Sequence, residues 1–443
     1  MEATHPRHRR TLLFLLLVAL CAGAVTPAAA HGDRERAGRP PVRELARVAR
    51  PLDDLRALEH MTGSATVVGV GEATHGSHEF FALKARLFRH LVATRGFTTF
   101  ALEAPWSTGL RLNDYVLRGE GDPRRIMREE FQHSYRFWNT REYLDLITWM
   151  RRHNVRHPHH PVQFMGNDVG YAGPALFDAV TGYTARHHPR LLPRVRELYR
   201  GSRPSGSVAG AMAAYLAKPL AERRRMAADV NEALALLARQ RPGPDPREHA
   251  WVLQHARNIA QVGTEYGFDL TGEGAAAAML HRDRAMAENT VWWQRWTGHR
   301  MLLSAHNGHV GYESSVPAAY PRLQGAFLRD LLGNGYVSVG LTFGRGSFNA
   351  HDARDPREPI RRFTLGARPP GTNEHTLERV AARDYCLDLR TAPGAARAWL
   401  DRPRPTLSIG TAWPWDLADA PARLGASYDV LIHLHRITAA GLL

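Results

Sequence analysis

The sequence contains almost no lysine. Of its 443 residues only Lys84 and Lys218 are lysines, so arginine supplies nearly all of the 58 basic side chains behind the net charge of +15. These arginines are spread along the whole chain and form no basic block. We therefore expect no specific nucleic-acid binding, although a basic surface attracts anions in general.

Cysteine is nearly absent as well, being limited to Cys21 and Cys386. Cys21 lies in an N-terminal segment that we expect to be removed, and one remaining thiol excludes an internal disulfide. We interpret Cys386 as a buried small apolar residue and not as a nucleophile. The hydrophobic content of 44% is that of a globular protein, so we expect packing to stabilise the fold.

Several catalytic motifs are missing too. The sequence has no G-x-S-x-G nucleophile elbow, no phosphate-binding loop with its lysine and no G-x-G-x-x-G. These absences argue against a serine nucleophile of that type and against a bound nucleotide. We expect no cofactor.

The first 30 residues have the pattern of a signal peptide. Three arginines at positions 7, 9 and 10 precede the apolar stretch 11–25, and three alanines end the segment at residue 30. The apolar stretch is too short for a spanning helix. We therefore expect cleavage near Ala30, a secreted or envelope-associated mature protein, and no integral membrane segment in it.

Short apolar runs alternate with helical patterns, which predicts an α/β fold with a largely parallel sheet flanked by helices. The predicted helices of the first half lie at residues 79–94 and 142–153. The predicted strands lie at residues 66–71, 98–102, 161–166, 301–305, 336–343, 406–410 and 428–433.

Residues 172–300 are rich in Ala, Arg and Leu and lack β-branched runs, which predicts a large helical insertion. Breaks are expected at 201–207 and 241–246, and residues 250–263 and 280–296 have the clearest helical patterns. We expect a long loop at 344–375. Because the helical segment interrupts the strand pattern, residues 31–443 are interpreted as one domain with an insertion.

Polar residues follow four of the predicted strands directly. They are the segment Glu72 to His75, then Glu103, then Asn167 and Asp168, and then the segment His306 to His309. The carboxyl ends of parallel strands line one crevice, where ligands bind in open α/β sheets. The sequence therefore predicts a shared active site at this edge.

Histidine and carboxylates suit general-base activation of water against a carbonyl carbon. His75 follows Glu72 by three residues, so the carboxylate can fix the imidazole tautomer and stabilise its protonated form. The alternative interpretation of this pair is a helix N-terminal turn with a capping role.

Two motifs resemble the erythromycin esterase family. The first is the stretch Gly71–Gly76 (GEATHG) with Glu79, Phe80 and Glu103, and the second is AHNGH at 305–309. The segment RDRAMA at 282–287 and the segments YVSVGLTFGRGSF and YDVLIHLHR are also similar to that family. The resemblance extends from about residue 45 to the C-terminus.

The resemblance implies hydrolysis of a macrolide lactone, without a metal and without a covalent enzyme intermediate. A histidine would activate the attacking water. On this chain that histidine is His75, with Glu72 and Glu103 as supporting carboxylates. His306 and His309 would lie opposite and stabilise the oxyanion or protonate the leaving alkoxide.

We expect substrate contacts from Lys84, Arg282, Trp106 and Asn307. Lys84 stands where macrolide-opening members often have arginine, and lysine lacks the planar bidentate guanidinium. Arg282 either points into the crevice or pairs with Asp283 on its own helix. For Asp168, a cap of the helix expected at 170–175 or a supporting role is favoured over orienting a histidine.

Three other functions stay open. The same His and Glu side chains could hold a metal ion in a metal-dependent hydrolase. The site could catalyse acyl transfer or cyclisation on a polyketide-like ester, or the chain could be a non-catalytic envelope-binding protein. The expected partner is a small-molecule ester or macrolactone, and degradation of an antibiotic, hence antibiotic resistance, is one possible role.

Overall fold

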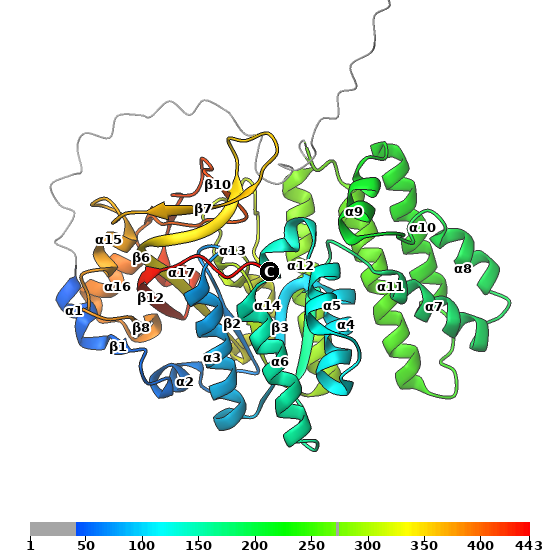
Figure 1. Cartoon of the computed structure of the whole chain (residues 1–443), viewed down its shortest axis with the longest axis horizontal. Helices are drawn as coiled ribbons and strands as arrows, with labels where there is room; N and C mark the ends of the chain where they lie inside the picture. Colours follow the sequence, from blue (N-terminus) through cyan, green and yellow to red (C-terminus); the bar gives the residue numbers. More distant parts are fainter. Residues whose placement is uncertain (1–40, 272–273) are drawn as a thin grey trace, which may run out of the picture.

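The computed structural model describes residues 41–271 and 274–443. The predicted signal peptide lies outside these residues. A mixed ten-stranded sheet runs through the molecule, with helices on both of its faces (Figure 1). Apart from two side branches, its strand order is β1-β8-β12-β6-β2-β5-β3-β4.

The central part of the sheet is parallel. Six neighbouring strands run in the same direction, from β12 to β4 in the order above. Their bounds are β2 Val67–Val70, β3 Phe97–Pro105, β4 Gln163–Asp168, β5 Arg300–Ser304, β6 Tyr336–Asp352 and β12 Val430–Ile437.

Shorter strands extend this parallel part. β8 (Tyr385–Asp388) runs antiparallel to β12, and β1 (Arg50–Pro51) runs antiparallel to β8. β7 (Ile360–Leu365) pairs antiparallel with the second half of β6, and β10 (Ala412–Trp413) pairs with it in parallel. A separate small pair joins β9 (Arg404–Pro405) and β11 (Pro421–Ala422).

Alternating residues of the central strands enter two different hydrophobic cores. Val68 and Val70 of β2 belong to the first core, whereas Val67 belongs to the second. In β3, Phe100 belongs to the first core and Ala101 to the second. Successive side chains of a strand point to opposite faces, so a sheet covered on both sides has apolar residues at every position.

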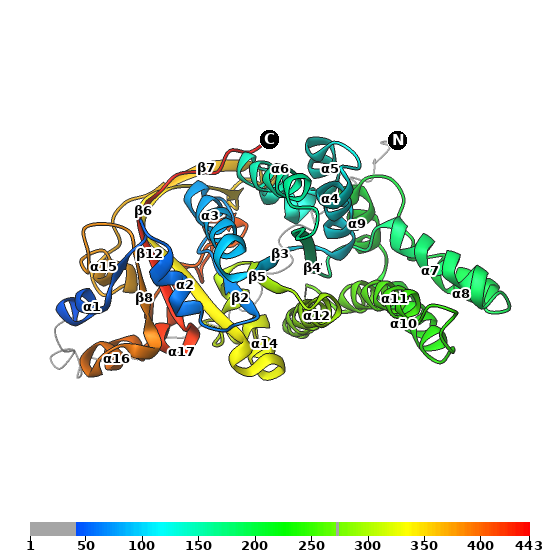
Figure 2. The ribbon, with the colours of Figure 1, turned by 90° about the horizontal axis from the view of Figure 1, so that it is seen from below.

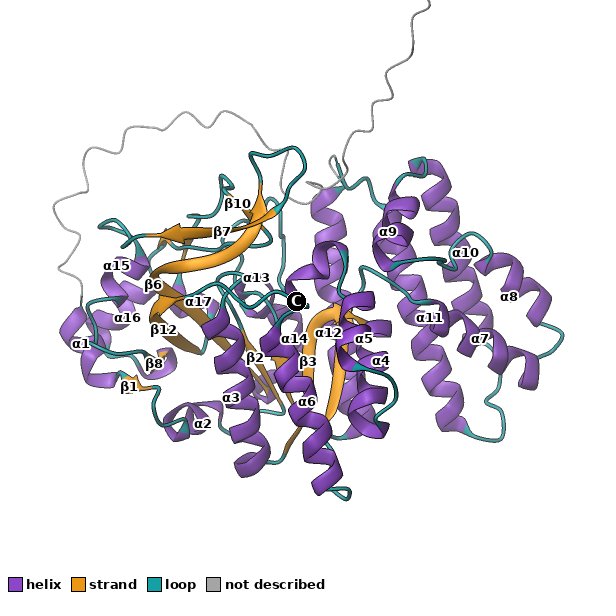
Figure 3. Cartoon of the chain, in the orientation of Figure 1, coloured by secondary structure: helices purple, strands orange, loops and turns teal. Residues whose placement is uncertain are grey.

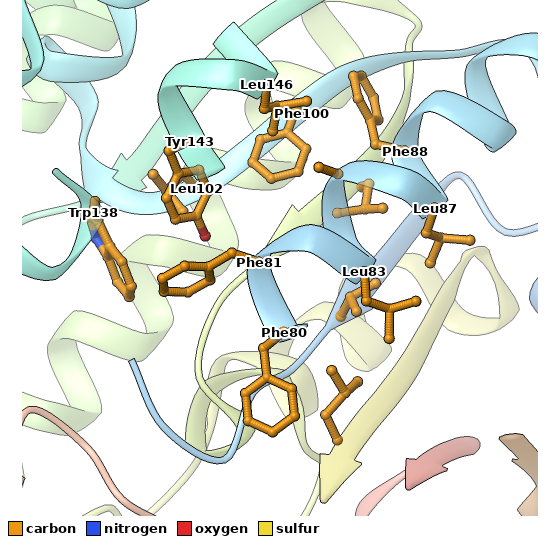
Figure 4. Packing of buried hydrophobic residues seen from close by; sticks show 14 of the residues in the cluster. Phe80, Phe81, Leu83, Leu87, Phe88, Phe100, Leu102, Trp138, Tyr143 and Leu146 are labelled. Carbon is orange, nitrogen blue, oxygen red and sulfur yellow. The ribbon is translucent and has the colours of Figure 1, made fainter. Parts of the chain in front are cut away.

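The helices of the first face are α2 (Arg56–Thr62), α3 (His78–Arg95), α4 (Trp106–Arg118), α5 (Pro123–Glu130) and α6 (Arg141–Arg156). Ser77 caps the N-terminus of α3, and Gly96 ends that helix in the left-handed conformation. Figure 4 shows the side chains of α3 packed against Phe100, Trp138 and Tyr143.

The second face is covered by α14 (Gln324–Leu332) and by α12, the last helix of the helical region α7–α12. Most of the other helices of this region extend the second hydrophobic core beyond α12. Figure 2 shows α3 and α6 on one side of the strands and α12 and α14 on the other. The region comprises α7 Pro174–His187, α8 Leu192–Tyr199, α9 Val208–Leu216, α10 Leu220–Ala238, α11 Pro246–Gly267 and α12 Ala275–Thr297 (Figure 3).

A third, smaller core lies beside β8 and β12 and includes Leu45, Trp399 and Leu424. The short helices around it and at the strand ends are α1 Val42–Val48, α13 Asn307–Val310, α15 Asn373–Leu377, α16 Gly394–Leu400 and α17 Leu424–Ser427. In the described residues we find no helix with the length and apolar character needed to span a bilayer.

The predicted α/β class, the parallel sheet and the helical region are confirmed. Two local predictions are wrong. Residues 406–410 form no strand and contribute only an isolated bridge between Ile409 and Thr74. The segment 344–375, which was expected to be a loop, contains the end of β6 and all of β7. The prediction failed because polar residues dominate this hairpin and hide the alternating pattern of a strand.

Helix α4 approaches β4 more closely than any side chain would allow. A Cβ added to Gly109 would lie 1.9 Å from the main-chain nitrogen of Gly166. Gly109 is followed through the helix by the buried residues Leu112 and Val116, which join the first core. The glycine therefore sets the distance between α4 and the strand that carries Asp168.

We predict that Gly109→Ala destabilises the protein, because the new methyl group overlaps the main chain of β4. Forced overpacking of this kind costs about 1–3 kcal/mol or more of unfolding free energy. Denaturant unfolding of the purified variant measures the loss. Gly182→Ala in α7 is the matched control, since its Cβ meets only the end of Arg186 at 3.6 Å. Equal stability of the two variants would contradict the prediction.

Candidate active site

Polar residues from three of the four predicted strand ends border one cavity, whereas Asn167 and Asp168 at the end of β4 do not line it. Glu72 and His75 follow β2, Glu103 lies near the end of β3, and His306 follows β5. The cavity has a volume of about 470 Å³, and it is lined by His75, Glu103, Arg282, His306 and His309. Its other walls include Tyr135, Trp138, Glu265, Tyr266, Tyr320 and parts of the segment 406–417.

His75 and Lys84 share the carboxylate of Glu72. Nδ1 of His75 lies 2.7 Å from Oε1 of Glu72, and Nζ of Lys84 donates to Oε2. Because a carboxylate only accepts, Nδ1 of His75 carries the proton and Nε2 keeps its lone pair. Lys84 is completely buried and also donates to Ser304 Oγ at 3.1 Å and to the carbonyl of Ala305 at 3.2 Å.

The carboxylate of Glu103 lies at the centre of a second group. Its Oε1 accepts from Nη2 of Arg282 at 3.0 Å and lies 3.3 Å from Nε2 of His309. Its Oε2 accepts from the main-chain N–H of His306 at 2.9 Å. Nε1 of Trp138 donates to the Glu103 carbonyl at 2.6 Å, so the main chain here is held as well.

Two neighbouring residues of α12 reach this group. Arg282 donates to both carboxylate oxygens of Asp168, at 2.9 and 2.6 Å. Asp283 lies 2.8 Å from Nδ1 of His309 and accepts from the main-chain N–H of Gln324 at 2.7 Å. Helix α12 therefore supplies the site with one cation and one anion.

His306 has one buried ring nitrogen without a hydrogen-bond partner among the described residues. Its Nδ1 accepts from the main-chain N–H of Gly308 at 3.1 Å, so a neutral ring carries its proton on Nε2. That buried Nε2 has no hydrogen-bond partner among the described residues. The rings of His306 and His75 have centroids 5.0 Å apart, and Trp138 lies edge-on to His75 at 4.7 Å.

Burial and neighbouring charge shift the pKa values of His306 and His309 in opposite directions. Burial and the nearby His75 hold the pKa of His306 well below its usual range. Burial also opposes the charged form of His309, but Asp283 and Glu103 outweigh it and raise that pKa to about 10. At neutral pH His306 is therefore a neutral donor and His309 is a cation.

The pKa values of Glu103 and Lys84 follow from the same surroundings. Burial works to raise the pKa of Glu103, but His309, His75 and Arg282 hold it well below its usual range. Burial lowers the pKa of Lys84 against the opposing effect of Glu72. An ionised Glu103 at the cavity wall is thus stable at neutral pH.

Three predicted substrate-binding residues have other contacts. Lys84 lies beneath Glu72 and does not line the cavity. Trp106 is 1% exposed and packs against Trp251 and Trp293 in the second core, away from the cavity. Asn307 borders the cavity, but its amide group bonds the main chain of Leu341 at 2.7 and 3.0 Å.

The two open sequence interpretations have structural answers. Arg282 lines the cavity and bonds Asp168 and Glu103, not its neighbour Asp283. Of the two roles favoured for Asp168, the cap is not formed, because α7 begins at Pro174 without a side-chain cap, and the supporting role agrees with its contacts. Asp168 supports the site by binding Arg282 and by accepting from the hydroxyl of Tyr135 at 2.9 Å.

Sequence reasoning missed Glu265, which lines the cavity from α11. It is 6% exposed, and its Oε2 has no hydrogen-bond partner in the part of the chain that the structure describes. Burial raises its pKa to about 8, with Arg282 opposing and Asp168 adding to the rise. It stands in a regular helical pattern far from any strand end, so nothing in the local sequence marks it.

The described residues offer one set of at least three donors close enough for a metal ion, and it is a different set. It consists of Glu378, His433 and His435. In the active-site group, both nitrogens of His309 and Nδ1 of His75 already contact carboxylates or Arg282. The donors of the active site therefore do not converge on one point.

Comparison with known proteins gives a consistent result. The model of the family described as Erythromycin esterase matches residues 92–437. The matched stretch includes Glu103, Arg282, His306 and His309, whereas the Glu72–His75 pair precedes it. The Escherichia coli protein described as "Erythromycin esterase type II" is 24% identical over 326 residues, which cover 68% of this chain and 73% of that protein.

Solved structures share the fold. A succinoglycan biosynthesis protein is 28% identical with a TM-score of 0.77, and a protein from Bacillus cereus is 29% identical with a TM-score of 0.81. Each match covers 91% of this chain and 98% of the other. A mutant of the erythromycin esterase EreC in its open conformation is 18% identical with a TM-score of 0.67, over 88% of this chain and 96% of its own.

We predict that Glu265→Gln changes how stability depends on pH. The folded side chain keeps its proton up to about pH 8, whereas an unfolded glutamate loses it near 4.5. The folded state therefore binds more protons between these values, and its stability falls as pH rises through them. Glutamine has no such loss, so the variant gains thermal stability relative to the parent protein as pH increases.

Thermal unfolding between about pH 5 and about pH 9 measures this difference, and we expect a relative gain of at least about 3 °C across the range. Glu288→Gln, at an exposed position of α12, is the matched control and runs parallel to the parent protein. A Glu265→Gln curve that also runs parallel would exclude a buried protonated Glu265.

Proposed function

Because this chain belongs to the erythromycin esterase family, we propose that it hydrolyses a macrolide-type lactone with a water molecule activated by His75. The observation that carries the proposal is the 2.7 Å contact between His75 and Glu72 beside the cavity. It fixes the proton on Nδ1 and leaves the basic Nε2 of a cavity-lining ring free to accept a proton.

In the first step, water attacks the carbonyl carbon of the ester and gives a proton to Nε2 of His75. A bond forms between the water oxygen and the carbonyl carbon, and the carbonyl oxygen becomes an oxyanion. Glu72 stabilises the imidazolium, as the acidic member of a serine triad does. Lys84, which donates to the second oxygen of Glu72, holds that carboxylate in place.

The oxyanion needs a hydrogen-bond donor, and His306 is suited to that role. Its Nε2–H is buried and unpaired among the described residues, and its ring lies 5.0 Å from that of His75. A donor that is already dehydrated and fixed stabilises developing charge without reorganisation. The cationic His309 and Arg282 add positive charge at the same wall.

In the second step, the bond between the acyl carbon and the leaving oxygen breaks. The proton held by His75 passes to that oxygen, and the products are a carboxylic acid and an alcohol on one opened chain. No side chain bonds to the substrate, so the proposal contains no covalent enzyme intermediate. Cys386 takes no part, because it is buried in the first core and burial raises its pKa to about 12.

The cavity suits a substrate with a large apolar body. Its volume of about 470 Å³ is within the range of small-molecule sites. Tyr135, Trp138, Tyr320 and Trp415 supply aromatic walls, while polar groups concentrate around His75 and Glu103. We propose that the apolar part of the lactone lies against these rings and that its ester faces the histidines.

His75→Asn is expected to lower kcat for ester hydrolysis by about 10²- to 10⁴-fold, because asparagine cannot take the proton from water. Steady-state kinetics measures the loss, and circular dichroism checks the fold. His157→Asn, at an exposed position, is the control and keeps the parent rate. Normal turnover by a folded His75→Asn protein would refute the mechanism.

Glu103→Gln is expected to reduce kcat about 100-fold or more with a smaller effect on KM. The amide removes the negative charge that faces Arg282 and His309, so these cations lose their fixed positions. The exposed Glu120→Gln serves as control. If kcat is unchanged, Glu103 has a structural role only.

Mass spectrometry of macrolides with different ring sizes, and of simple aryl esters, tests the reaction itself. We expect addition of one water to a macrolide, at the same rate with and without EDTA. Loss of activity in EDTA that returns with added metal would favour the metal-dependent alternative. Hydrolysis of aryl esters alone would leave an esterase with a different natural substrate.

A further inference from the structure

Outside the cavity, three potential metal ligands lie together near the end of β12. They are Glu378, which follows α15, and His433 and His435 of β12. One donor atom from each residue lies within 4.8 Å of the others, and the described residues contain no other such group. None of the three lines the active-site cavity.

Glu378 turns one carboxylate oxygen toward His433. Its Oε1 accepts from Nη1 of Arg345 at 3.2 Å, and its Oε2 lies 3.2 Å from Nε2 of His433. Gly344 makes room for this carboxylate, because a Cβ at that position would lie 2.0 Å from Oε2. The absence of a side chain at residue 344 is therefore required for the position of Oε2.

The hydrogen bonds of His433 allow its Nε2 to act as a ligand. His433 is completely buried, and its Nδ1 lies 3.0 Å from the hydroxyl of Thr342. That hydroxyl can donate to the carbonyl of Ile432 at 3.3 Å, so its oxygen can accept a hydrogen bond from Nδ1–H. In this tautomer the lone pair of Nε2 points toward Glu378.

In His435 the other nitrogen, Nδ1, is available as a ligand, because Nε2 makes the hydrogen bond to a carbonyl oxygen. Its Nε2 lies 2.9 Å from the carbonyl of Ala381, which can only accept. Nε2 therefore carries a proton, and Nδ1 is left with a lone pair when the ring is neutral. Oδ1 of Asp384 lies 3.4 Å from this Nδ1 and adds negative charge beside it.

We propose that Glu378, His433 and His435 form a binding site for a divalent transition-metal ion of the zinc type. Two imidazoles and one carboxylate are a common zinc ligand set, with water in the fourth position. In such sites the second nitrogen of each histidine donates to a carbonyl or another oxygen, as in His435 and His433 here. Imidazole ligands favour zinc, copper or nickel over magnesium or calcium.

The ion would join β12 to the segment that follows α15, at residues that do not line the cavity. Without a metal, a proton on Nε2 of His433 makes the same contact with Glu378. Metal binding thus replaces a hydrogen bond between these two residues with two stronger bonds to one cation. We expect the occupied site to stabilise the protein and to leave catalysis by His75 unchanged.

Titration of the metal-free, untagged protein with Zn²⁺ or Co²⁺ tests the proposal. We expect one ion to bind per chain, with a Co²⁺ absorption spectrum of nitrogen and oxygen ligands and a higher Tm in Zn²⁺. His433→Asn and Glu378→Gln abolish both effects. Gly344→Ala, which displaces the carboxylate, and Thr342→Val, which removes the partner of Nδ1, each weaken binding by at least about tenfold.

His90→Asn is the matched control, because His90 pairs with Glu59 at 2.7 Å without a third ligand. It binds the ion as the parent protein does. The proposal is wrong if the parent protein binds no ion saturably, or if folded His433→Asn and Glu378→Gln proteins bind it equally well. Thr342→Val and Gly344→Ala keep every ligand, so they decide the matter if the ligand variants do not fold.

Discussion

The cost of burying carboxylates governs the architecture of this site. A carboxylate removed from water needs a cation or several N–H donors, or it takes up a proton. At the edge of this sheet the buried carboxylates are each paired: Glu72 with Lys84 and His75, Glu103 with Arg282 and His309, Asp168 with Arg282, and Asp283 with His309. The paired groups come from the strand ends and from α3, α12 and α13, so these elements must pack in the one arrangement that brings each carboxylate to its partner.

Glu265 is buried as well, but it differs from these paired carboxylates. It lines the same cavity but has no ion-pair partner among the described residues, and burial raises its pKa to about 8. It is therefore a neutral acid at neutral pH. The site thus keeps charged groups on the wall that carries His75 and Glu103 and an uncharged donor on the wall formed by α11.

Periodicity and strand-end chemistry carried most of the sequence interpretation. Buried parallel strands such as β2 and β5 are short apolar runs, and the polar residues that follow them are easy to locate. The pattern did not reveal the hairpin of β6 and β7, because both of its strands are polar and partly exposed there. The register of exposed strands depends on pairing partners that local sequence does not specify.

The same limit applies to the site. Residues at strand ends, such as His75, Glu103 and His306, share a cavity because the topology brings strand ends together. Contacts made by helices were harder to foresee. Whether Arg282 would face Asp168 or Asp283 depends on the rotation of α12 against β4. Trp106 was expected to contact the substrate, although it begins α4 and packs in the second core. Packing between distant elements decided both cases.

Adjacent placement of Arg282 and Asp283 on α12 has a consequence for the electrostatics of the cavity. Any shift of this helix away from the sheet withdraws a positive and a negative group together, so the net charge of the cavity stays constant. The proton affinities do not, because Glu103 loses a stabilising cation while His309 loses a stabilising anion. Such a shift would therefore raise the pKa of Glu103 and lower the pKa of His309 while the net charge of the cavity stays the same.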